Sequence, residues 1–439
     1  MRTQACSFVA ATPDDQWHYW FGYYDKNPLS LDGTRLLAHR VRFCDRFPSP
    51  NDVAEVGFVT GWHESKPTFH RLAATHAWNW QQGAMLRWYT TADGTPAVAF
   101  NDIEDGCSIF RILNLDGEEV ERWGVAPYAL GVNGDAATLS FGRLSRLRPE
   151  YGYPALQDPN PNDPSPATDG IYCIRDGTAE LIVSIDQLDK ITGGNSPRAG
   201  GELHQHVNHI MFNPSGNRIC FMHRFDRSDG ILQSRLFTSD LKGNDVRLLF
   251  EGMCSHYDWM DDETILAWGG KRSLLGDGNA PKSIKQRAMT VARRTLKPIY
   301  YAMGKPRILM NKIMKDSYLL IKDVDVRANG APDPQLFAAG ELTCDGHCTF
   351  NRGGVTPGRW VVTDGYPDLK SRQPLFLWDV KHDSGIEIGR WHTPRSLDRE
   401  LRVDLHPRFN EDATIVCIDS AMEDRRRMYL VDVSEITAV

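Results

Sequence analysis

The sequence predicts an all-β protein: one seven-bladed β-propeller over residues 1–439, with a basic, partly helical insertion at 271–315 between the fifth and sixth blades. Two observations lead to this prediction. A local pattern recurs along the chain, in which a tight turn is followed by a short apolar strand. Long helical periodicity is absent outside the insertion. Repeats of this kind are typical of four-stranded propeller blades.

Four strong copies of the pattern begin with a histidine, carry an aromatic residue three positions later, and continue into a turn and a strand. Their anchors are His209, His256, His347 and His406. The first two anchors lie 47 residues apart, and the last two lie 59 residues apart. Strands are expected after the four turns, at 218–222, 264–268, 360–363 and 414–418.

Three weaker copies precede these four and bring the number of units to seven. Their strands are expected at 34–38, 96–100 and 137–141. Polar, turn-rich segments separate the units, and the clearest of these is the proline-rich stretch at 158–166.

Composition excludes several classes of protein. The formal charge of −7 argues against a dedicated nucleic-acid binder. The sequence contains no run of 18 apolar residues, so we expect no membrane-spanning segment. The apolar stretch near the N-terminus is too short for a signal peptide. The nine cysteines are scattered, which favours reduced thiols over a disulfide framework. We therefore expect a cytoplasmic protein.

The insertion at 271–315 carries twelve Lys and Arg residues against one acid, Asp277. Apolar residues between 284 and 296 fall on one helical stripe, flanked by Pro281 and Pro298. A basic amphipathic helix is typical of a segment that contacts an anionic membrane surface, here the inner membrane face, or of a clamp for a polyanion. The alternative is a helix that packs on the blade with a solvated basic face.

The propeller geometry brings particular positions together at one mouth of the central channel. Residues just before the first strand of each blade and just after its second strand meet there. The four anchor histidines, with Lys26 and Gln82, belong to the first set. The second set includes His39, Arg40, Asn101, Arg143, His223 and Arg224. Convergent polar groups in a concave mouth favour a ligand-binding site.

Six sequence blocks at the predicted mouth and turns occur in a fixed order. They are 20–28 (WFGYYDKNP), 77–83 (AWNWQQG), 148–153 (RPEYGY), 345–347 (DGH), 363–368 (TDGYPD) and 404–407 (DLHP). Together they resemble the seven-bladed propeller polysaccharide lyases, the group that includes oligogalacturonate lyases and ulvan lyases. The resemblance covers most of the chain outside 271–315.

The resemblance implies β-elimination at a uronic acid, with catalytic His, Tyr and Arg residues. In the oligogalacturonate branch it also implies a divalent metal, held by histidines of the later blades. The metal ligands that it implies here are His256, His347 and His406, and imidazole ligands suit Mn or Zn. The tyrosine of the third blade is Tyr151 or Tyr153.

β-Elimination needs a cation that neutralises the uronate carboxylate, a base for the C5 proton, and an acid for the leaving oxygen. Arginine suits the first role, histidine the second and tyrosine the third. The candidates are Arg224 or Arg143 for the carboxylate, His209 or His223 as the base, and Tyr153 or Tyr24 as the acid. Further substrate-binding candidates are Tyr24, Lys26, His39, Arg40, Gln82, Asn101, Tyr257 and Arg402.

Two functions follow from these observations. The first is a lyase-like enzyme that acts on an acidic oligosaccharide or polysaccharide. The second is a non-catalytic propeller that binds a glycan or a partner in surface-polysaccharide synthesis and is docked at the membrane by its insertion. The second is motivated by Gln82 and Asn101, which stand where ulvan-type members place histidines.

Overall fold

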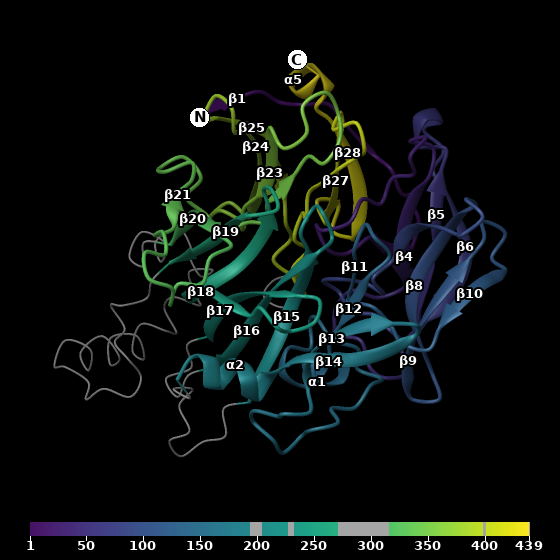
Figure 1. Ribbon diagram of the computed structural model, residues 1–439. Helices are drawn as coiled ribbons and strands as arrows, with labels where there is room; N and C mark the ends of the chain where they lie inside the picture. The colour runs from purple at the N-terminus through teal and green to yellow at the C-terminus, as the bar shows by residue number, and fades with distance from the viewer. Residues whose placement is uncertain (194–203, 227–231, 271–315, 398–400, 439) are drawn as a thin grey trace.

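The computed structural model describes residues 1–193, 204–226, 232–270, 316–397 and 401–438. Within these residues the chain consists mainly of antiparallel strands, which form six hydrogen-bonded sheets. In Figure 1 the sheets follow one another around the molecule in chain order, from purple through teal and green to yellow.

Three four-stranded sheets come from the first part of the chain. The first contains β3 (His18–Trp20), β4 (Leu36–Val41), β5 (Ala54–Thr60) and β6 (Thr68–Thr75), with a 3₁₀ turn at Trp62–Glu64. The second contains β7 (Arg87–Thr90), β8 (Pro96–Glu104), β9 (Cys107–Leu113) and β10 (Glu119–Trp123). The third contains β11 (Ala129–Leu130), β12 (Ala136–Thr138), β13 (Gly170–Arg175) and β14 (Thr178–Ser184).

A seven-stranded sheet follows. It runs through β15 (Gln205–Phe212), β16 (Arg218–Asp226), β17 (Leu232–Asp240), β18 (Arg247–Trp259), β19 (Thr264–Gly270), β20 (Ser317–Lys322) and β21 (Gln335–Leu336). The sheet is continuous because β18 is 13 residues long. Its first half pairs with β17 and its second half with β19.

Two sheets from the last part of the chain take up the two N-terminal strands. One joins β22 (Thr349–Phe350), β23 (Trp360–Asp364), β24 (Arg372–Asp379) and β25 (Ser384–His392), with β1 (Arg2–Thr3) added in parallel. The other joins β26 (Arg408–Phe409), β27 (Ile415–Ser420) and β28 (Arg427–Asp432) to β2 (Phe8–Ala10). A short helix, α5 (Ser434–Thr437), follows β28.

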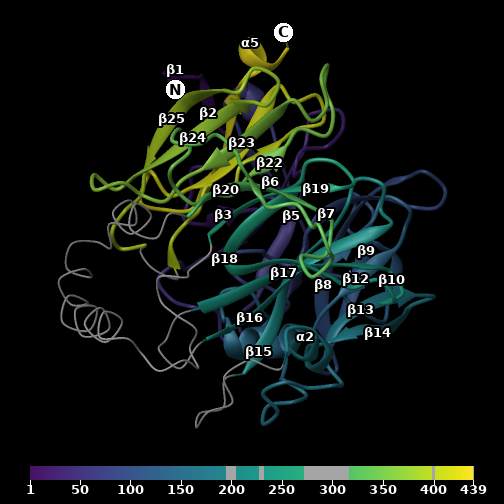
Figure 2. The ribbon, with the colours of Figure 1, turned by 60° about the vertical axis from the view of Figure 1, so that its left-hand side comes forward.

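The pairing of β2 with β28 joins the two ends of the chain. The two strands are antiparallel to each other, with Phe8 paired with Val431 and Ala10 with Tyr429. Figures 1 and 2 both show the chain ends on the same side of the molecule, beside the yellow C-terminal strands. The first strands of the chain therefore complete sheets that its last strands begin.

The sequence-predicted strands are present, with one exception. Strands cover the expected positions at 34–38, 96–100, 218–222, 264–268, 360–363 and 414–418 to within two residues. The strand expected at 137–141 is wrong in its second half, because β12 ends at Thr138 and helix α1 (Phe141–Leu147) begins at Phe141. The Ser140 side chain caps this helix by accepting a hydrogen bond from the Arg143 backbone N–H. A second short helix, α2 (Ile185–Ile191), follows β14.

Two of the anchor histidines lie at irregularities in their strands. The pairing register of β15 shifts between Asn208 and Met211, and that of β18 shifts between Cys254 and Tyr257. His209 and His256 lie within these shifts. Such bulges turn a side chain away from the regular alternation of the strand and are frequent beside active sites.

The apolar core lies between the sheets. Aromatic residues fill its N-terminal part, where Trp20 lies 5.4 Å from Trp78 and 5.0 Å from Trp80, measured between ring centroids. These three side chains come from the sequence blocks at 20–28 and 77–83, so part of each block builds the scaffold. Packing of this kind holds the neighbouring loops in place.

The basic insertion predicted at 271–315 lies outside the described residues. In the parts of the chain that the structure describes, no helix is long and apolar enough to cross a membrane. All nine cysteines lie in the described residues and none forms a disulfide.

Candidate functional site

Three histidines of the second half of the chain form a compact cluster. The ring centroids of His256 and His347 are 4.0 Å apart, and those of His347 and His406 are 4.2 Å apart. All three residues are at most 4% exposed. The spacing of the repeat had predicted that these anchors converge, and the structure places them together.

Carboxylates contact the Nδ1 atoms of two of these rings. Asp345 lies 2.9 Å from Nδ1 of His256, and Asp364 lies 2.9 Å from Nδ1 of His347. The same Asp364 accepts hydrogen bonds from the backbone N–H groups of His347 and His406. A carboxylate on Nδ1 fixes the ring orientation and leaves Nε2 as the nitrogen that presents a lone pair.

The third histidine carries an unpartnered nitrogen. Nε2 of His406 is buried and has no hydrogen-bond partner among the described residues. His406 adopts a left-handed backbone conformation with φ 42°, which is uncommon for a residue with a side chain. Strain of this kind persists where the surroundings enforce it and is concentrated at functional sites.

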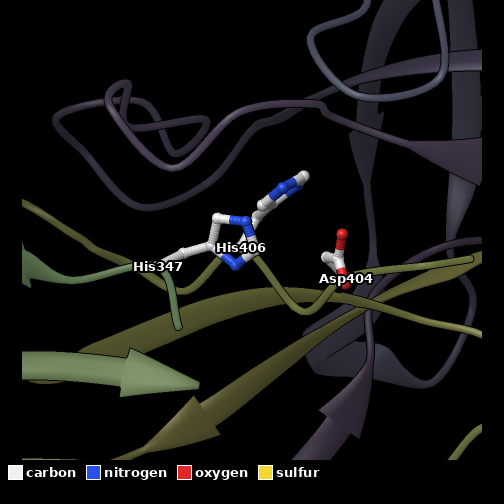
Figure 3. A group of neighbouring side chains, drawn as sticks. All are labelled: His347, Asp404 and His406. Atoms are coloured by element: carbon white, nitrogen blue, oxygen red, sulfur yellow. The ribbon is translucent and has the colours of Figure 1, made fainter. Parts of the chain in front are cut away.

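Asp404 completes a set of donors that could hold a metal ion. One ligand atom from each of His347, Asp404 and His406 lies within 4.8 Å of the others, and the three side chains lie around a common space (Figure 3). Asp404 also receives two hydrogen bonds from Arg402, at 2.5 and 2.8 Å. The guanidinium therefore fixes the carboxylate beside the imidazoles.

The donor chemistry fits a divalent cation. Two imidazoles and one carboxylate, from His347, His406 and Asp404, are donors that Mn²⁺, Zn²⁺ and Fe²⁺ accept, whereas the predicted ligand His256 adjoins His347 but is not part of this set. The carboxylates of Asp345 and Asp364 contact His256 and His347, and Asp404 adds a third carboxylate, which is hydrogen-bonded by Arg402. The excess of negative charge favours a bound cation.

The charges also set the pKa values of the rings. Burial lowers the pKa of His347, but the carboxylates of Asp364, Asp404 and Asp345 outweigh burial and raise it above its ordinary value. Burial, followed by the nearby charge of His347, lowers the pKa of His256 and places that of His406 well below its usual range. Two of the three rings are therefore neutral at pH 7, as metal ligands must be.

A tyrosine and the fourth anchor histidine adjoin this cluster. The hydroxyl of Tyr23 is hydrogen-bonded to the His209 ring, with Nε2 at 2.9 Å, and the Tyr23 ring lies 5.2 Å from that of His406. His209 has a φ of 57° and is 3% exposed. Burial and the charge of Arg224 hold the pKa of His209 well below its ordinary value.

Tyr151, rather than Tyr153, is the tyrosine of the third sheet that reaches the cluster. Its ring lies 5.6 Å from His209 and 6.3 Å from Tyr23. Tyr153 instead stacks on Phe141 at 4.2 Å and accepts a hydrogen bond from Asn101. Tyr153, predicted as a candidate acid, is therefore engaged away from the cluster, and Tyr151 is the residue that adjoins His209. Burial raises the pKa of Tyr151, which keeps its hydroxyl protonated.

Arg224 is a buried cation that has no acidic partner among the residues the structure describes. It is 4% exposed, and its Nη2 donates to the backbone carbonyls of Cys254 and Ser255 at 3.0 and 3.1 Å. No carboxylate of the described residues lies within ion-pair distance of its guanidinium, and its buried Nε has no partner there. An unpaired buried charge is costly, so this position favours an anionic ligand.

Two other predicted catalytic residues are engaged elsewhere. The Arg143 guanidinium donates to the backbone carbonyls of Gln205, Asn160 and Asp163, at 2.8 to 3.1 Å. It thus ties helix α1 to neighbouring chain segments, because the predicted strand here is a helix. His223 is hydrogen-bonded to the Gln205 side chain at 2.6 Å and lies near Phe237, away from the histidine cluster.

Several predicted substrate-binding residues have structural partners. His39 stacks on Trp20 and accepts the Ala84 backbone N–H, and burial lowers its pKa to about 3. Arg40 pairs with Glu55 at 2.7 Å. These contacts fix the first sheet and leave both residues outside the cluster.

The amide side chains of Gln82 and Asn101, which were predicted to bind substrate, form an internal hydrogen-bond network. Gln82 donates to the hydroxyl of Tyr128, and Tyr128 donates to Asn208 at 3.1 Å. Asn101 donates to the Pro127 carbonyl at 3.0 Å and to Tyr153. These bonds connect the second and third sheets to β15, which carries His209.

The remaining predicted residues lie near the cluster or support it. The Tyr24 ring is 5.3 Å from His347, and its hydroxyl donates to the Tyr257 carbonyl at 2.9 Å. Tyr257 in turn donates to the Cys220 carbonyl at 2.8 Å. Lys26 pairs with Asp25 at 2.6 Å, and burial lowers its pKa to about 8.

The residues that sequence reasoning missed are mainly acids. Asp345 and Asp404 lie two residues before His347 and His406, so an Asp-x-His spacing in the sequence could have identified them. Asp364 stands beside a Gly-Tyr-Pro turn, where Asp commonly caps the turn, so its position in the sequence does not reveal that it binds His347. Tyr23 was not distinguished from its neighbour Tyr24, because adjacent tyrosines give no signal about which one reaches the channel.

Comparison with known proteins supports the fold. No family model and no curated protein sequence matches the chain. Among solved structures, an oligogalacturonate lyase from Vibrio parahaemolyticus matches with a TM-score of 0.52 at 12% identity, over 100% of both chains. An oligogalacturonate lyase in complex with manganese matches with a TM-score of 0.51 at 11% identity, over 98% of both chains.

The chain shares the fold of these lyases. This supports the predicted β-propeller, and at such low identity it shows the fold alone. A puromycin-hydrolyzing peptidase from Mycobacterium tuberculosis also matches, with a TM-score of 0.48 at 12% identity, over 99% of this chain and 55% of that chain. That match is too weak to support a conclusion about function.

Proposed function

We propose that the protein is a lyase-like propeller that cleaves a uronate-containing oligosaccharide by β-elimination. The observation that supports it most is Arg224, a buried guanidinium without a carboxylate partner in the described residues, beside the Tyr23–His209 pair and the three-histidine cluster. The oligogalacturonate lyase fold and the acidic-sugar chemistry of that name agree with this proposal.

Arg224 would bind the carboxylate of the reacting sugar. Its Nε, which has no partner in the described residues, can donate a charge-assisted hydrogen bond to a carboxylate, and this neutralisation makes the C5 proton more acidic. The low polarity of the buried surroundings strengthens the interaction.

His209 would remove the C5 proton. Its pKa is low in the free protein because the ring is buried and faces the charge of Arg224. An anionic substrate on Arg224 offsets that charge and raises the pKa of His209. The imidazole thus becomes a stronger base when the substrate is present.

A tyrosine would protonate the leaving oxygen. Tyr151 and Tyr23 both lie beside His209, and the raised pKa of Tyr151 keeps its proton available at neutral pH. The electrons of the former C5–H bond then form the C4–C5 double bond as the C4–O bond breaks, so that no water is consumed.

His347, His406 and Asp404 would hold a divalent cation, with the predicted ligand His256 beside them. When bound, such an ion supplies Lewis-acid neutralisation of a carboxylate oxygen. The manganese complex of a related fold favours Mn²⁺ as the first ion to test, with Zn²⁺ as the second.

We also propose seven blades, of which the seven-stranded sheet makes two that share β18. We further propose that the protein acts on short oligosaccharides in the cytoplasm. Its nine free cysteines agree with a reducing compartment.

The proposal is tested with the full chain and a panel of uronate oligosaccharides, with and without Mn²⁺. We expect growth of ultraviolet absorbance from a 4,5-unsaturated uronate. No absorbance change with any oligosaccharide contradicts the proposed elimination. Binding without absorbance change would instead support the non-catalytic glycan-binding function.

A further inference from the structure

His209 has a strained backbone conformation inside the bulge of β15. Its φ of 57° lies in the left-handed region, and neither His209 nor Ile210 is paired with a residue of β16. Such a conformation is costly for a residue with a side chain, so it persists only where neighbouring groups enforce it. The contacts that enforce it therefore also determine where the imidazole lies.

A tyrosine hydroxyl holds the N–H side of this residue. The hydroxyl of Tyr128, which immediately precedes β11, accepts the His209 backbone N–H at 3.2 Å and donates to the Asn208 side chain at 3.1 Å. The Gln82 side chain donates to the same hydroxyl, and the Asn208 oxygen also accepts the His209 N–H at 2.8 Å. With one bond donated and two accepted, the buried hydroxyl of Tyr128 is fixed in orientation.

A second tyrosine hydroxyl holds the carbonyl side. The Tyr257 hydroxyl is hydrogen-bonded to the His209 carbonyl oxygen and lies 2.8 Å from the carbonyl oxygen of Cys220. Tyr257 is completely buried. Peptide groups in a bulge lose their regular partners on the neighbouring strand, and a buried carbonyl needs another donor in their place. Tyr257 supplies that donor.

Tyr24 holds Tyr257 in a similar way. The Tyr24 hydroxyl accepts the backbone N–H of Tyr257 at 3.1 Å and donates to the Tyr257 carbonyl at 2.9 Å. Tyr257 borders the register shift of β18, so a tyrosine hydroxyl satisfies peptide groups beside this bulge as well. The contacts thus run from the N-terminal segment through β18 to the His209 peptide.

We propose that Tyr128 and Tyr257 are positioning residues, which hold the His209 backbone from both sides and thereby direct its imidazole toward Tyr23 and the C5 proton of the substrate. This inference rests on the proposed function, because it takes His209 to be the base. The two hydroxyls bond to the His209 backbone rather than to its ring. Substrate binding, which is proposed for Arg224, should therefore not depend on them.

The first test measures how accessible His209 is, and it needs no substrate. The full chain and the variants Tyr257→Phe and Tyr128→Phe are treated with diethylpyrocarbonate, and modification of each histidine is quantified by mass spectrometry. We expect His209 to react about tenfold faster in Tyr257→Phe, because loss of one buried hydrogen bond makes local opening about that much more frequent. His39 and His223, which are buried elsewhere, should react at the wild-type rate.

Tyr172→Phe is the matched control. The Tyr172 hydroxyl also donates to a backbone carbonyl, at 2.8 Å, but on the third sheet and away from the cluster. Its loss should leave the reactivity of His209 unchanged. Each variant removes one oxygen atom and keeps the ring, so we expect the fold to survive. If Tyr257→Phe does not fold, Tyr128→Phe carries the test, with a smaller expected increase because the His209 N–H keeps its second acceptor.

The second test measures initial rates with a uronate oligosaccharide. We expect kcat of Tyr257→Phe to fall about 10- to 100-fold, because a small displacement of a base from the proton that it removes is costly. KM should stay about constant, since Arg224 still binds the carboxylate. A residue that only stabilised the fold would change neither constant while the protein is folded.

The outcomes separate positioning from stability and from the proposed function. Unchanged reactivity of His209, or an equal increase at His39 and His223, overturns the proposed hold on the His209 backbone. Faster reaction of His209 alone, with kcat unchanged, overturns its importance for catalysis. If the wild type cleaves no uronate oligosaccharide, the proposed function fails, while the reactivity of His209 still decides whether the two hydroxyls position it.

Discussion

At the scale of single residues, the site is organised as pairs of an imidazole and a supporting group. Asp345 orients His256, Asp364 orients His347, and Tyr23 contacts His209. The supporting groups decide which nitrogen of each ring faces the centre. Their replacement should therefore change ligand binding more than it changes folding.

The Asp364→Asn variant tests this at the metal cluster. An amide cannot orient and polarise the His347 ring as a carboxylate does, so we expect Mn²⁺ affinity to fall about 10- to 100-fold. Calorimetric titration of the metal-free protein measures it. Asp368→Asn, a change in an acid that pairs with Arg372 instead, is the control. Unchanged affinity in Asp364→Asn would contradict the proposed cluster.

The Arg224→Met variant separates function from stability. Loss of the cation should lower kcat/KM at least about 100-fold, because one charged partner of a buried pair is missing. The free energy of unfolding should stay constant or rise, because an unpaired buried charge has been replaced by an apolar group of similar length. Urea denaturation and initial rates measure the two effects. Marked destabilisation with retained activity would show that Arg224 is a structural residue.

The pH dependence of metal binding follows from His347. Its carboxylate neighbours raise its pKa, so the proton that a metal must displace is held more firmly than on an ordinary histidine. As the pH falls through that pKa, the ring becomes protonated and Mn²⁺ affinity should decrease, with proton release on binding. Calorimetry in buffers of different ionisation enthalpy measures this release. Affinity that is constant below neutral pH would contradict ligation by His347.

At the scale of elements, bulged strands place the histidines and a capped helix alters the third sheet. The sequence repeat predicted the strands because tight turns and apolar runs are local signals. It did not predict α1, since the capping bond of Ser140 decides between a continued strand and a helix. The same helix explains why Arg143 lies in a backbone-binding position rather than at the site.

The Ser140→Ala variant tests the role of this cap. Removal of the hydroxyl that accepts the Arg143 N–H should lower the free energy of unfolding by about 1 kcal/mol. Urea denaturation of the variant and of Ser7→Ala, a change at an exposed serine, provides the comparison. If both variants lose the same stability, the cap does not contribute specifically to α1.

At the scale of the whole molecule, the sequence predicted the class of fold and the meeting of the anchor histidines. Repeat spacing carries that information, because equivalent positions of successive sheets face the same axis. It could not predict which of two adjacent tyrosines, or which of two arginines, reaches the site. That choice depends on packing between segments far apart in the chain, as with Tyr23 and His209, which are 186 residues apart.

The closed arrangement also explains how the site combines groups from the whole chain. Tyr23 comes from the segment after β3, Arg224 from the middle of the chain and His406 from the C-terminal part, while β2 pairs with β28 to join the ends. A site assembled in this way depends on closure of the whole molecule rather than on any one sheet.

The central claim is elimination at an acidic sugar, and the masses of the products test it most directly. Trigalacturonate is incubated with the full chain and Mn²⁺, and the fragments are weighed by mass spectrometry. We predict two fragments whose masses sum to that of the substrate, one of them an unsaturated uronide. Fragments whose masses sum to the substrate plus one water would show hydrolysis and contradict the proposed chemistry.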